Sequence, residues 1–343
     1  MSEIVFQQGL FWDPGDPGGR RRLFAETVTN VVVEISSYCN RQCTYCPVSS
    51  VDRISDRKSL PAEIYAKILE NLAQISYVQS LCLNLYNEPM ADRPLLIARI
   101  REARAELPKC RIYFSTNGDF LSPDYVREMV EAGLSELYVT VHMPKGRRYD
   151  DPYAITLFTD LSKRLGKSIK VDGFSPGATI SGRMTLHGLP INVFSINYDV
   201  YGTDRAGSVK KLTQATFRRT SPCNRPFHDF TVSHEGTIFP CCQMFVDNEH
   251  HRASFAIGRI TDFPDIFAAY ATQAMARWRA ELLRFGPKKS PCDTCNLECR
   301  DPQPGESERR DELYRRFVRP VPDAPPHPRR PIFGRWLDGG KSE

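Results

Sequence analysis

Strand-like and helix-like segments alternate along the first two-thirds of the chain, and this alternation constrains the fold more than any other feature. The first strand-like segment is the β-branched run Val31–Ile35, and the pattern continues to about Arg205. At about 30 residues for each strand–helix unit, the stretch accommodates about six units. Such units form parallel strands with right-handed crossovers. The sequence therefore predicts an α/β fold, a partial (β/α)6 barrel, because six units are too few for the closed eight-stranded barrel.

The expected elements place particular residues at one edge of the sheet. Strands are expected at residues 31–35, 80–85, 111–115, 136–141, 168–171 and 191–200, and helices at 61–72, 95–105, 122–132 and 153–165. Because parallel strands end at the same edge, the chemistry of such folds gathers there. The residues at these ends are Cys39–Cys46, Asn87, Glu88, Pro89, Asn117, His142 and Arg205.

The use of cysteine indicates metal binding in a reducing compartment. Eleven cysteines among 343 residues are too few for a disulfide scaffold, and they are clustered. Clustered thiols of this kind are typical of metal ligands in the cytoplasm. The net charge of +5 is weak for this length, and no segment resembles a membrane helix or a signal peptide. We therefore expect a cytoplasmic protein without a nucleic-acid or membrane partner.

Three cysteines follow the first expected strand in a C-x3-C-x2-C arrangement. Cys39, Cys43 and Cys46 lie close enough in sequence for one loop to hold a soft metal. Three thiolates leave one iron of a four-iron cluster without a protein ligand, and an open coordination position is a reaction site. The alternatives are a zinc site, which lacks a fourth ligand nearby, and three unrelated core thiols.

This loop resembles the signature of the radical S-adenosylmethionine (SAM) enzymes, in which an aromatic residue, here Tyr45, precedes the third cysteine. The L-Y-N-E-P segment after the second expected strand is similar to that family's Gly-Gly-Glu-Pro motif, with Tyr86 and Asn87 in place of the glycines. The resemblance implies a SAM-binding 4Fe–4S cluster on the three cysteines. It also implies that Glu88 binds the SAM amino group and that Asn87 and Asn117 belong to the same cofactor site.

In that family, SAM chelates the unique iron of the cluster, and one electron cleaves SAM to methionine and a hydrogen-abstracting 5′-deoxyadenosyl radical. The protein positions the substrate and excludes competing reactants. Arg205 lies in a G-T-D-R-A-G segment similar to one in related enzymes, and it either pairs with the SAM carboxylate or forms a structural salt bridge. His142 is expected at the cavity, either as a contact to adenosine or substrate or as a satisfied polar residue.

A second group of cysteines lies in the last third of the chain. Cys223 and Cys241 come first, and Cys292, Cys295 and Cys299 follow as C-x2-C-x3-C. The group is similar to the SPASM/Twitch extension, which carries auxiliary 4Fe–4S clusters in some radical SAM enzymes. The number of cysteines fits one auxiliary cluster, with Cys223, Cys241, Cys292 and Cys295 as ligands. Replacement of one ligand by Cys299, or a zinc site, is the alternative.

Four cysteines remain outside these ligand sets. Cys242 is expected to face away from the cluster, because adjacent side chains of a strand point to opposite faces. Cys242 and Cys299 are either packing residues or thiols that donate a hydrogen atom to a substrate radical. Cys82 and Cys110 lie amid apolar residues and are expected to be core thiols.

Charged residues near the expected cavity are further candidates. Lys145, Arg147 and Arg148 follow His142 in a basic loop that either binds an anionic substrate or is simply solvated. Lys170 and Asp172 are expected at the end of a strand, where they can serve as acid or base.

Three classes of function fit these features. The first is a radical SAM oxidoreductase that dehydrogenates or epimerises a small natural product, such as a sugar or aminocyclitol. The second is a maturase of a ribosomal precursor peptide, which is less favoured because only 38 residues precede Cys39, too few for a typical peptide-recognition domain. The third is an iron–sulfur electron carrier, which has no use for a SAM site. The expected partners are a small-molecule substrate or precursor peptide and an electron donor such as flavodoxin or ferredoxin.

Changes in composition divide the chain into four expected parts. These are an N-terminal extension over residues 1–26, the partial barrel over 27–210, a SPASM/Twitch-like domain over 211–302 and a charged, proline-rich tail over 303–343. Residues Asp13–Arg22 are expected to form a loop, and the segment 234–240 a hairpin with Gly236 at its turn. In the tail, Glu306–Arg316 is helix-like and Pro320–Pro331 is basic and proline-rich. We expect the tail to be solvated or to dock near the active site.

Overall fold

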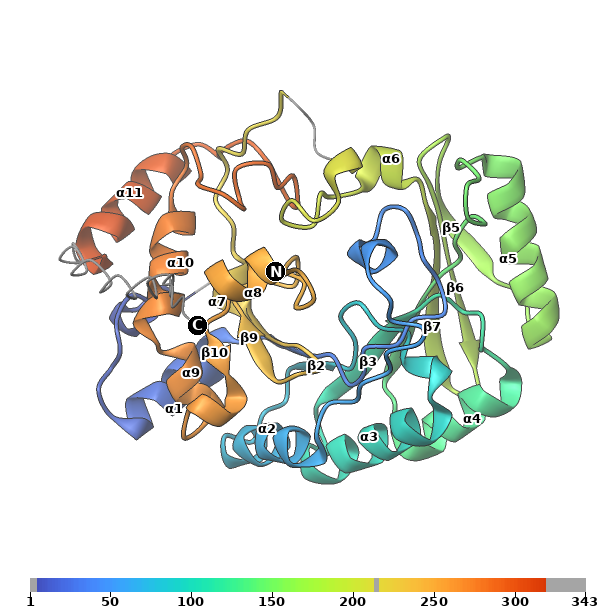
Figure 1. Cartoon of the computed structure of the whole chain (residues 1–343), viewed down its shortest axis with the longest axis horizontal. Coiled ribbons are helices and arrows are strands. Elements are labelled where there is room, and N and C mark those ends of the chain that lie inside the picture. Colours follow the sequence, from blue (N-terminus) through green and yellow to red (C-terminus); the bar gives the residue numbers. More distant parts are fainter. Residues whose placement is uncertain (1–4, 213–215, 319–343) are drawn as a thin grey trace, which may run out of the picture.

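The computed structural model describes residues 5–212 and 216–318, and within them ten strands form one sheet (Figure 1). The strand order is β10-β9-β8-β1-β2-β3-β4-β7-β6-β5. The strands are β1 (Asn30–Val33), β2 (Ser80–Cys82), β3 (Arg111–Thr116), β4 (Glu136–Thr140), β5 (Lys170–Ser175), β6 (Thr179–Leu186), β7 (Leu189–Ile196), β8 (Asp229–Val232), β9 (Thr237–Phe239) and β10 (Gly258–Arg259). The run from β8 to β7 is parallel, and antiparallel strands extend it at both edges. The chain is therefore a mixed α/β protein with a large open sheet.

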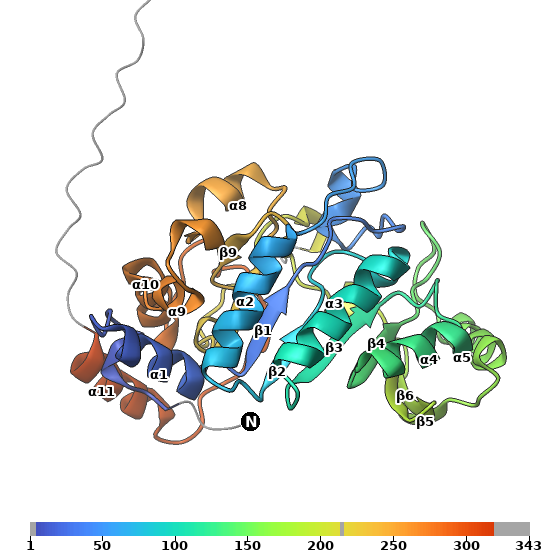
Figure 2. The same ribbon diagram turned by 90° about the horizontal axis from the view of Figure 1, so that it is seen from below.

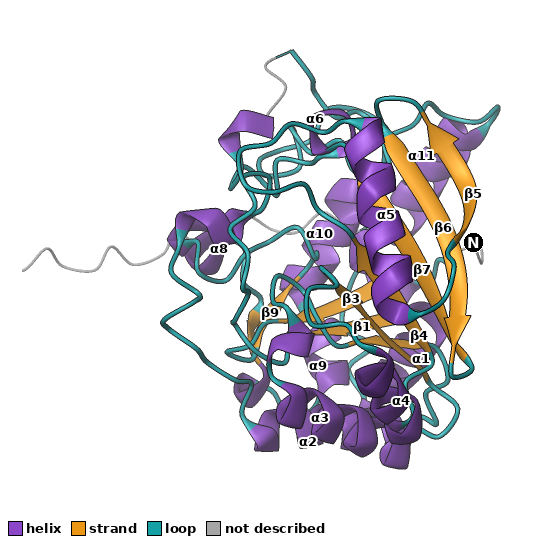
Figure 3. Ribbon diagram, turned by 90° about the vertical axis from the view of Figure 1, so that its right-hand side faces the viewer, coloured by secondary structure: helices purple, strands orange, loops and turns teal. Residues whose placement is uncertain are grey.

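Helices cover one face of the parallel strands, as the crossover connections require. The helices are α1 (Pro17–Thr27), α2 (Ala62–Gln74), α3 (Arg93–Glu106), α4 (Pro123–Ala132), α5 (Asp151–Leu165), α6 (Tyr198–Tyr201), α7 (Arg225–His228), α8 (Glu249–Ser254), α9 (Ile266–Tyr270), α10 (Gln273–Leu283) and α11 (Glu306–Phe317). Figure 2 shows α2 and α3 across the strands, and Figure 3 shows α5 beside β6 and β7. Within residues 5–212 and 216–318, none of the helices has the length and apolar character that crossing a bilayer requires.

Between β4 and β7 the chain departs from the expected alternation of strands and helices. Residues 168–171 were expected to form a parallel strand. They instead lead into β5, which pairs antiparallel with β6, and β6 leads directly into β7. His187 and Gly188 join β6 to β7 with φ values of 50° and 86°, the left-handed geometry of a tight two-residue hairpin. Parallel strands need a crossover of a dozen or more residues, and this turn is far too short for one.

The sixth parallel strand comes instead from the last third of the chain. Strand β8 pairs in parallel with β1, and Val33 lies opposite Val232 in that register. The predicted hairpin is confirmed, because β8 and β9 are antiparallel and Gly236 has a φ of 78° at the turn. The region that holds the second cysteine group is thus built directly into the sheet beside the first cysteine loop.

The N-terminal segment contains a helix that the sequence analysis missed. We expected a loop over Asp13–Arg22, but α1 begins at Pro17. Asp16 caps the helix, because its Oδ1 accepts a hydrogen bond from the backbone N–H of Gly19 at 2.7 Å, and proline is favoured at the first helical position. Phe24 is fully buried and packs edge-on against aromatic rings of β8 and α9. The helix therefore joins the core shared by the two ends of the chain.

The start of the C-terminal tail is packed, and helix α11 confirms the expected helix. Glu306 and Arg310 are buried and form an ion pair at 2.8 Å. Arg310 also donates a hydrogen bond to the backbone carbonyl of Leu283 in α10 at 2.9 Å. This helix is thus docked on the body of the protein. The segment Pro320–Pro331 lies outside the described residues.

Candidate active site

The carboxyl ends of the parallel strands surround a cavity of about 310 Å³, which we call the cofactor cavity. Its lining includes all the residues that the resemblance assigned to the first cluster and SAM, namely Cys39, Cys43, Cys46, Asn87, Glu88, Asn117, His142 and Arg205. They come from the loops that follow β1, β2, β3, β4 and β7. Because these strands are parallel, segments far apart in sequence end at one place.

The first cysteine loop is shaped by backbone turns. The N–H of Cys46 donates to the carbonyl of Cys43 at 2.9 Å, and a short 3-10 helix over Pro47–Ser50 follows. Desolvation raises the pKa of Cys39 to about 12, and burial also raises the pKa values of Cys43 and Cys46. Thiolates in such a place need the positive charge of a bound metal, so these residues fit a metal cluster.

The spacing of the cysteine sulfurs bears on whether a single zinc ion fits either group. Tetrahedral zinc with Zn–S bonds of about 2.3 Å holds its sulfurs about 3.8 Å apart. Among the described residues, one group of three metal-ligating side chains has all its ligand atoms within 4.8 Å of one another, and that group is His234, Glu235 and Asp247. Neither cysteine group is that compact. That spacing is looser than one tetrahedral zinc ion requires.

Glu88 is a buried acceptor on the floor of the cofactor cavity. Its carboxylate accepts hydrogen bonds from the Thr116 hydroxyl at 2.7 Å and from the backbone N–H groups of Asn117 at 2.7 Å and Met90 at 3.1 Å. Desolvation nevertheless raises the pKa of Glu88 to about 7. A cation placed beside this carboxylate restores its charge. The side chain is therefore suited to an ammonium ligand.

The two residues in place of the family's glycines have defined contacts. The backbone N–H of Tyr86 donates to Glu34 Oε1 at 3.1 Å, and its ring lies edge-on to Phe245, 5.1 Å between centroids. The Tyr86 hydroxyl reaches across to the C-terminal region. Asn87 donates through Nδ2 to the Ser36 hydroxyl at 3.1 Å. These side chains fix the loop after β2 without relying on glycine backbone.

Aromatic rings form one wall of the cofactor cavity. The Tyr45 hydroxyl lies 2.7 Å from Nδ1 of His142, and the Tyr45 ring stacks on Tyr198 with centroids 3.9 Å apart. Burial lowers the pKa of His142 to about 4, so the imidazole is neutral near pH 7. Tyr198, the first residue of α6, was not among the site residues predicted from the sequence. Its only sequence signal is an aromatic residue just after the last parallel strand.

Arg205 enters the cavity from a strained turn. Arg205 and Ala206 have φ values of 52° and 54°, a conformation that side chains other than glycine rarely adopt. The guanidinium carbon of Arg205 lies 5.9 Å from the centre of the Tyr86 ring. The buried Nε of Arg205 has no hydrogen-bond partner among the described residues. An unsatisfied guanidinium of this kind suits a carboxylate ligand.

A second cavity, the auxiliary cavity, contains the four predicted auxiliary ligands together. Cys223, Cys241, Cys292 and Cys295 all line it, beside apolar residues such as Trp278. Cys242 and Cys299 do not line it. Cys299 Sγ instead donates to the carbonyl of Cys295 at 3.4 Å. The two remaining cysteines, Cys82 and Cys110, are buried as expected.

Arg219 is a structural residue of the auxiliary cavity that the sequence analysis missed. Its guanidinium is almost fully buried and donates to four backbone carbonyls, those of Ser221, Pro222, Cys295 and Leu297, at 2.6–3.2 Å. These carbonyls lie on the two chain segments that carry the cysteines. Arg219 therefore ties together ligands that are about 70 residues apart, and no motif spacing signals this role.

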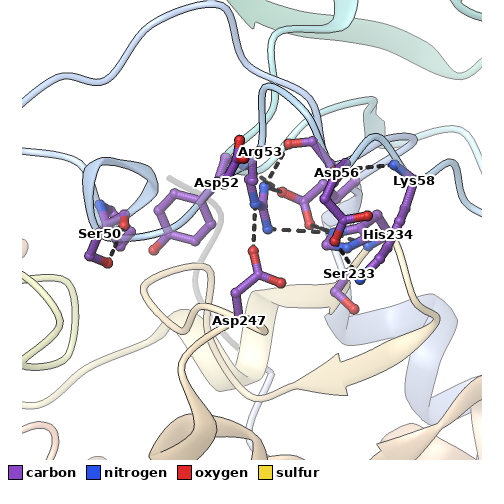
Figure 4. Close-up of polar contacts among 12 residues, drawn as sticks. Ser50, Asp52, Arg53, Asp56, Lys58, Ser233, His234 and Asp247 are labelled. Carbon is purple, nitrogen blue, oxygen red and sulfur yellow. Dashed lines mark hydrogen bonds and ion pairs between the residues drawn. The ribbon is translucent and has the colours of Figure 1, made fainter.

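A buried ion-pair network, also missed, joins the first cysteine loop to the hairpin of the C-terminal region (Figure 4). Arg53 pairs with Glu34 at 2.7 Å and with Asp247 at 2.6 Å, and Glu34 accepts from His234 Nδ1 at 2.8 Å. The carboxylate of Asp247 is thus engaged by Arg53, and Glu235 lies 3.6 Å from Lys58. The compact group of His234, Glu235 and Asp247 therefore belongs to an ion-pair network.

The remaining charged candidates lie in two different places. Lys145, Arg147 and Arg148 line a larger cavity next to the cofactor cavity. Lys170 and Asp172 lie on edge strand β5, where Asp172 pairs with Arg183 at 2.5 Å, and they line neither cavity. Their expected acid–base position depended on β5 being a parallel strand, which it is not.

Comparison with known proteins supports the assignment made from the residues. The chain matches the family model of the radical SAM superfamily over residues 33–188 and that of the SPASM iron–sulfur cluster-binding domain over residues 223–300. It is 27% identical over 215 residues to the S-adenosyl-L-methionine-dependent 2-deoxy-scyllo-inosamine dehydrogenase of Niallia circulans, covering 63% of this chain and 74% of the relative.

A solved structure has the same fold. The crystal structure of BtrN in complex with AdoMet and 2-DOIA superimposes with a TM-score of 0.54 at 18% identity, covering 79% of this chain and 94% of BtrN. The matched domains imply a SAM-binding 4Fe–4S cluster, an auxiliary cluster and SAM as cofactors. The chain therefore belongs to the radical SAM superfamily and carries a C-terminal iron–sulfur cluster-binding domain of the SPASM type.

Proposed function

We propose that this enzyme is a radical SAM dehydrogenase that oxidises a secondary alcohol of a small sugar- or aminocyclitol-like substrate to a ketone. The proposal depends mainly on one observation, that Cys39, Cys43, Cys46 and Glu88 line the same cavity. A second cavity is lined by four cysteines. The similarity to an inosamine dehydrogenase supports the substrate class.

The residues of the cofactor cavity have distinct proposed roles. Cys39, Cys43 and Cys46 would hold a four-iron cluster, which would supply the electron for reductive cleavage of SAM to a hydrogen-abstracting radical. Glu88 would accept hydrogen bonds from the SAM amino group, because its carboxylate is buried and a cationic ligand such as SAM favours its charged form. Arg205 holds the SAM carboxylate through its free donor. Asn87, Asn117 and neutral His142 are further polar residues that line the cofactor cavity.

The auxiliary cavity favours dehydrogenation over epimerisation. Cys223, Cys241, Cys292 and Cys295 would hold a cluster that could accept the electron that oxidation leaves behind. An epimerase needs a thiol that reaches the substrate radical, and Cys242 and Cys299 are absent from the lining of the cofactor cavity. Their role as hydrogen-atom donors stays a prediction.

The proposed chemistry also predicts an electron-donor partner and a cellular location for the protein. Cleavage of SAM requires a one-electron donor, for which a flavodoxin or ferredoxin is suited. Eleven free cysteines fit a reducing compartment, so we propose a cytoplasmic location. A precursor peptide as substrate is the second candidate, and the cavity lined by Lys145, Arg147 and Arg148 makes an acidic peptide the form to test.

The proposal is tested with anaerobically reconstituted protein, SAM and dithionite. Aminocyclitols and sugars that carry deuterium on the alcohol carbons are the probes, and mass spectrometry of 5′-deoxyadenosine is the measurement. We expect deuterium in 5′-deoxyadenosine and one ketone formed per SAM cleaved, with no product from a Cys43→Ala variant. Deuterium transfer without ketone formation would favour epimerisation, and transfer only from a peptide would overturn the proposal.

A further inference from the structure

The larger cavity beside the cofactor cavity has a volume of about 550 Å³, and we call it the basic cavity. Arg41, Cys43, Tyr45 and Tyr198 line both cavities. A molecule in the basic cavity therefore lies against the wall of the SAM site. Its volume is in the range of cavities that bind small molecules. This is where the substrate of the proposed reaction fits.

The lining of the basic cavity carries an excess of positive charge. Its cations are Arg41, Lys145, Arg147, Arg148 and Lys211, and its single acidic residue is Asp199. Two of these cations are already balanced, because Arg41 pairs with Asp119 at 2.5 Å and Arg147 with Asp150 at 2.9 Å. Five cations thus face three carboxylates, an excess of two.

The cations without a carboxylate partner come from two segments on the rim. Among the described residues, the Lys145 ammonium donates a hydrogen bond to the neutral side chain of Gln42, at 3.3 Å, and forms no ion pair. Arg148 and Lys211 have no side-chain partner within the part of the chain that the structure describes. Lys145 and Arg148 lie in the loop after β4, and Lys211 lies in the segment after α6. Both segments present cations to the same cavity.

We propose that the substrate carries a phosphate group, which Lys145, Arg148 and Lys211 bind in the basic cavity. The excess of two positive charges matches a dianionic phosphate better than a single carboxylate. A guanidinium flanked by ammonium groups matches phosphate oxygens in both charge and geometry. The inference rests on the proposed function, because it assigns the substrate of that reaction to the class of phosphorylated polyols.

Pyrophosphate is the probe for this charge recognition, and isothermal titration calorimetry on the SAM-loaded holoenzyme is the measurement. We expect saturable binding that a Lys145→Gln/Arg148→Gln variant weakens at least about tenfold, because it removes two charge-assisted contacts to the anion. The matched control is Lys167→Gln/Arg101→Gln, which removes two exposed cations far from the cavity and leaves binding unchanged. Thermal unfolding verifies that both variants are folded.

Three outcomes overturn the proposal. They are the absence of saturable binding, equal weakening in the test and control variants, and tighter binding of a glutamate-rich octapeptide than of pyrophosphate through the same residues. The last outcome would assign the basic cavity to an acidic peptide. Because pyrophosphate binding needs no turnover, this result is independent of whether a ketone is formed in the test of the proposed function.

Discussion

The hydroxyl of Tyr86 donates a hydrogen bond to the backbone carbonyl of Cys242 at 3.1 Å. Tyr86 lines the cofactor cavity, and Cys241, the neighbour of Cys242, lines the auxiliary cavity. One side chain, in a position where the family motif has glycine, therefore spans the wall between the two cysteine sites. A ring and a hydrogen bond at this position hold the two cavities at a fixed separation.

Loss of this hydrogen bond is predicted to change the auxiliary cluster. In Tyr86→Phe we expect the reduction potential of that cluster to shift, because the backbone next to the predicted ligand Cys241 loses the hydrogen bond that fixes its position. The potential is measured by a redox titration followed by electron paramagnetic resonance. The control is Tyr65→Phe in helix α2. This change also removes a buried hydrogen bond from a tyrosine hydroxyl to a backbone carbonyl, at 3.0 Å. Equal potentials in both variants would contradict a specific role for Tyr86.

Iron content is predicted to separate ligand cysteines from the others. The native protein should bind about eight irons, two 4Fe–4S clusters, after anaerobic reconstitution. Cys295→Ala should retain about four, because its sulfur lines the auxiliary cavity, whereas Cys299→Ala should retain about eight. Iron and sulfide analysis provides the measurement. A loss of about four irons in Cys299→Ala alone would identify Cys299 as the fourth ligand.

The affinity for SAM is predicted to depend on pH through Glu88. Burial raises the pKa of this carboxyl to about 7, so below that pH the free site is mostly protonated and neutral. A cationic ligand binds the charged form, and SAM affinity should therefore rise with pH up to about 7 and then level off. His142, with a pKa of about 4, does not titrate in this range.

The matching variant is Glu88→Gln, which cannot ionise. We expect SAM affinity to fall about tenfold or more at pH 8, since a charge-assisted bond contributes about 1.5–3 kcal/mol, and the pH dependence to disappear. Equilibrium dialysis with labelled SAM from pH 5.5 to 8.5 gives both results. A variant that keeps the native pH profile would show that another group controls binding.

Removal of Arg53 is predicted to destabilise the fold. Its partner Glu34 is fully buried, so Arg53→Met leaves a buried carboxylate without its main counter-charge, and this costs about 3–5 kcal/mol of the free energy of unfolding. The control is Arg93→Met, which breaks a largely exposed pair with Glu128 and costs at most about 1 kcal/mol. Urea denaturation measures both. Similar losses in the two variants would mean that the buried network contributes no more than a surface pair.

Local sequence determined the parts of the site that depend on neighbouring residues. Cys39, Cys43 and Cys46 lie in one loop, so their spacing alone predicts a shared metal cluster. Glu88 and Asn117 follow strands that the sequence places side by side, and parallel strands align their ends. Gly236 marks a hairpin turn for an equally local reason, since its φ of 78° favours glycine.

Other features depend on contacts between distant segments, which no local pattern encodes. Glu34 and His234 are 200 residues apart in sequence and meet only because β8 pairs with β1. A short run of strand residues does not specify the strand with which it pairs. The sequence therefore did not predict which segment forms the sixth parallel strand. The His187–Gly188 turn was readable in principle, because glycine after a polar residue between two apolar strands is typical of hairpins.

The sequence by itself thus predicted the cluster ligands and determined the class of chemistry, because cysteine spacing and loop position are short-range properties. The tertiary structure alone decided which cations surround the basic cavity and how Tyr86 and Arg53 join the two halves. Those relationships depend on strand pairing and side-chain packing over long separations, where many arrangements satisfy the same hydrophobic pattern and only the complete fold selects one.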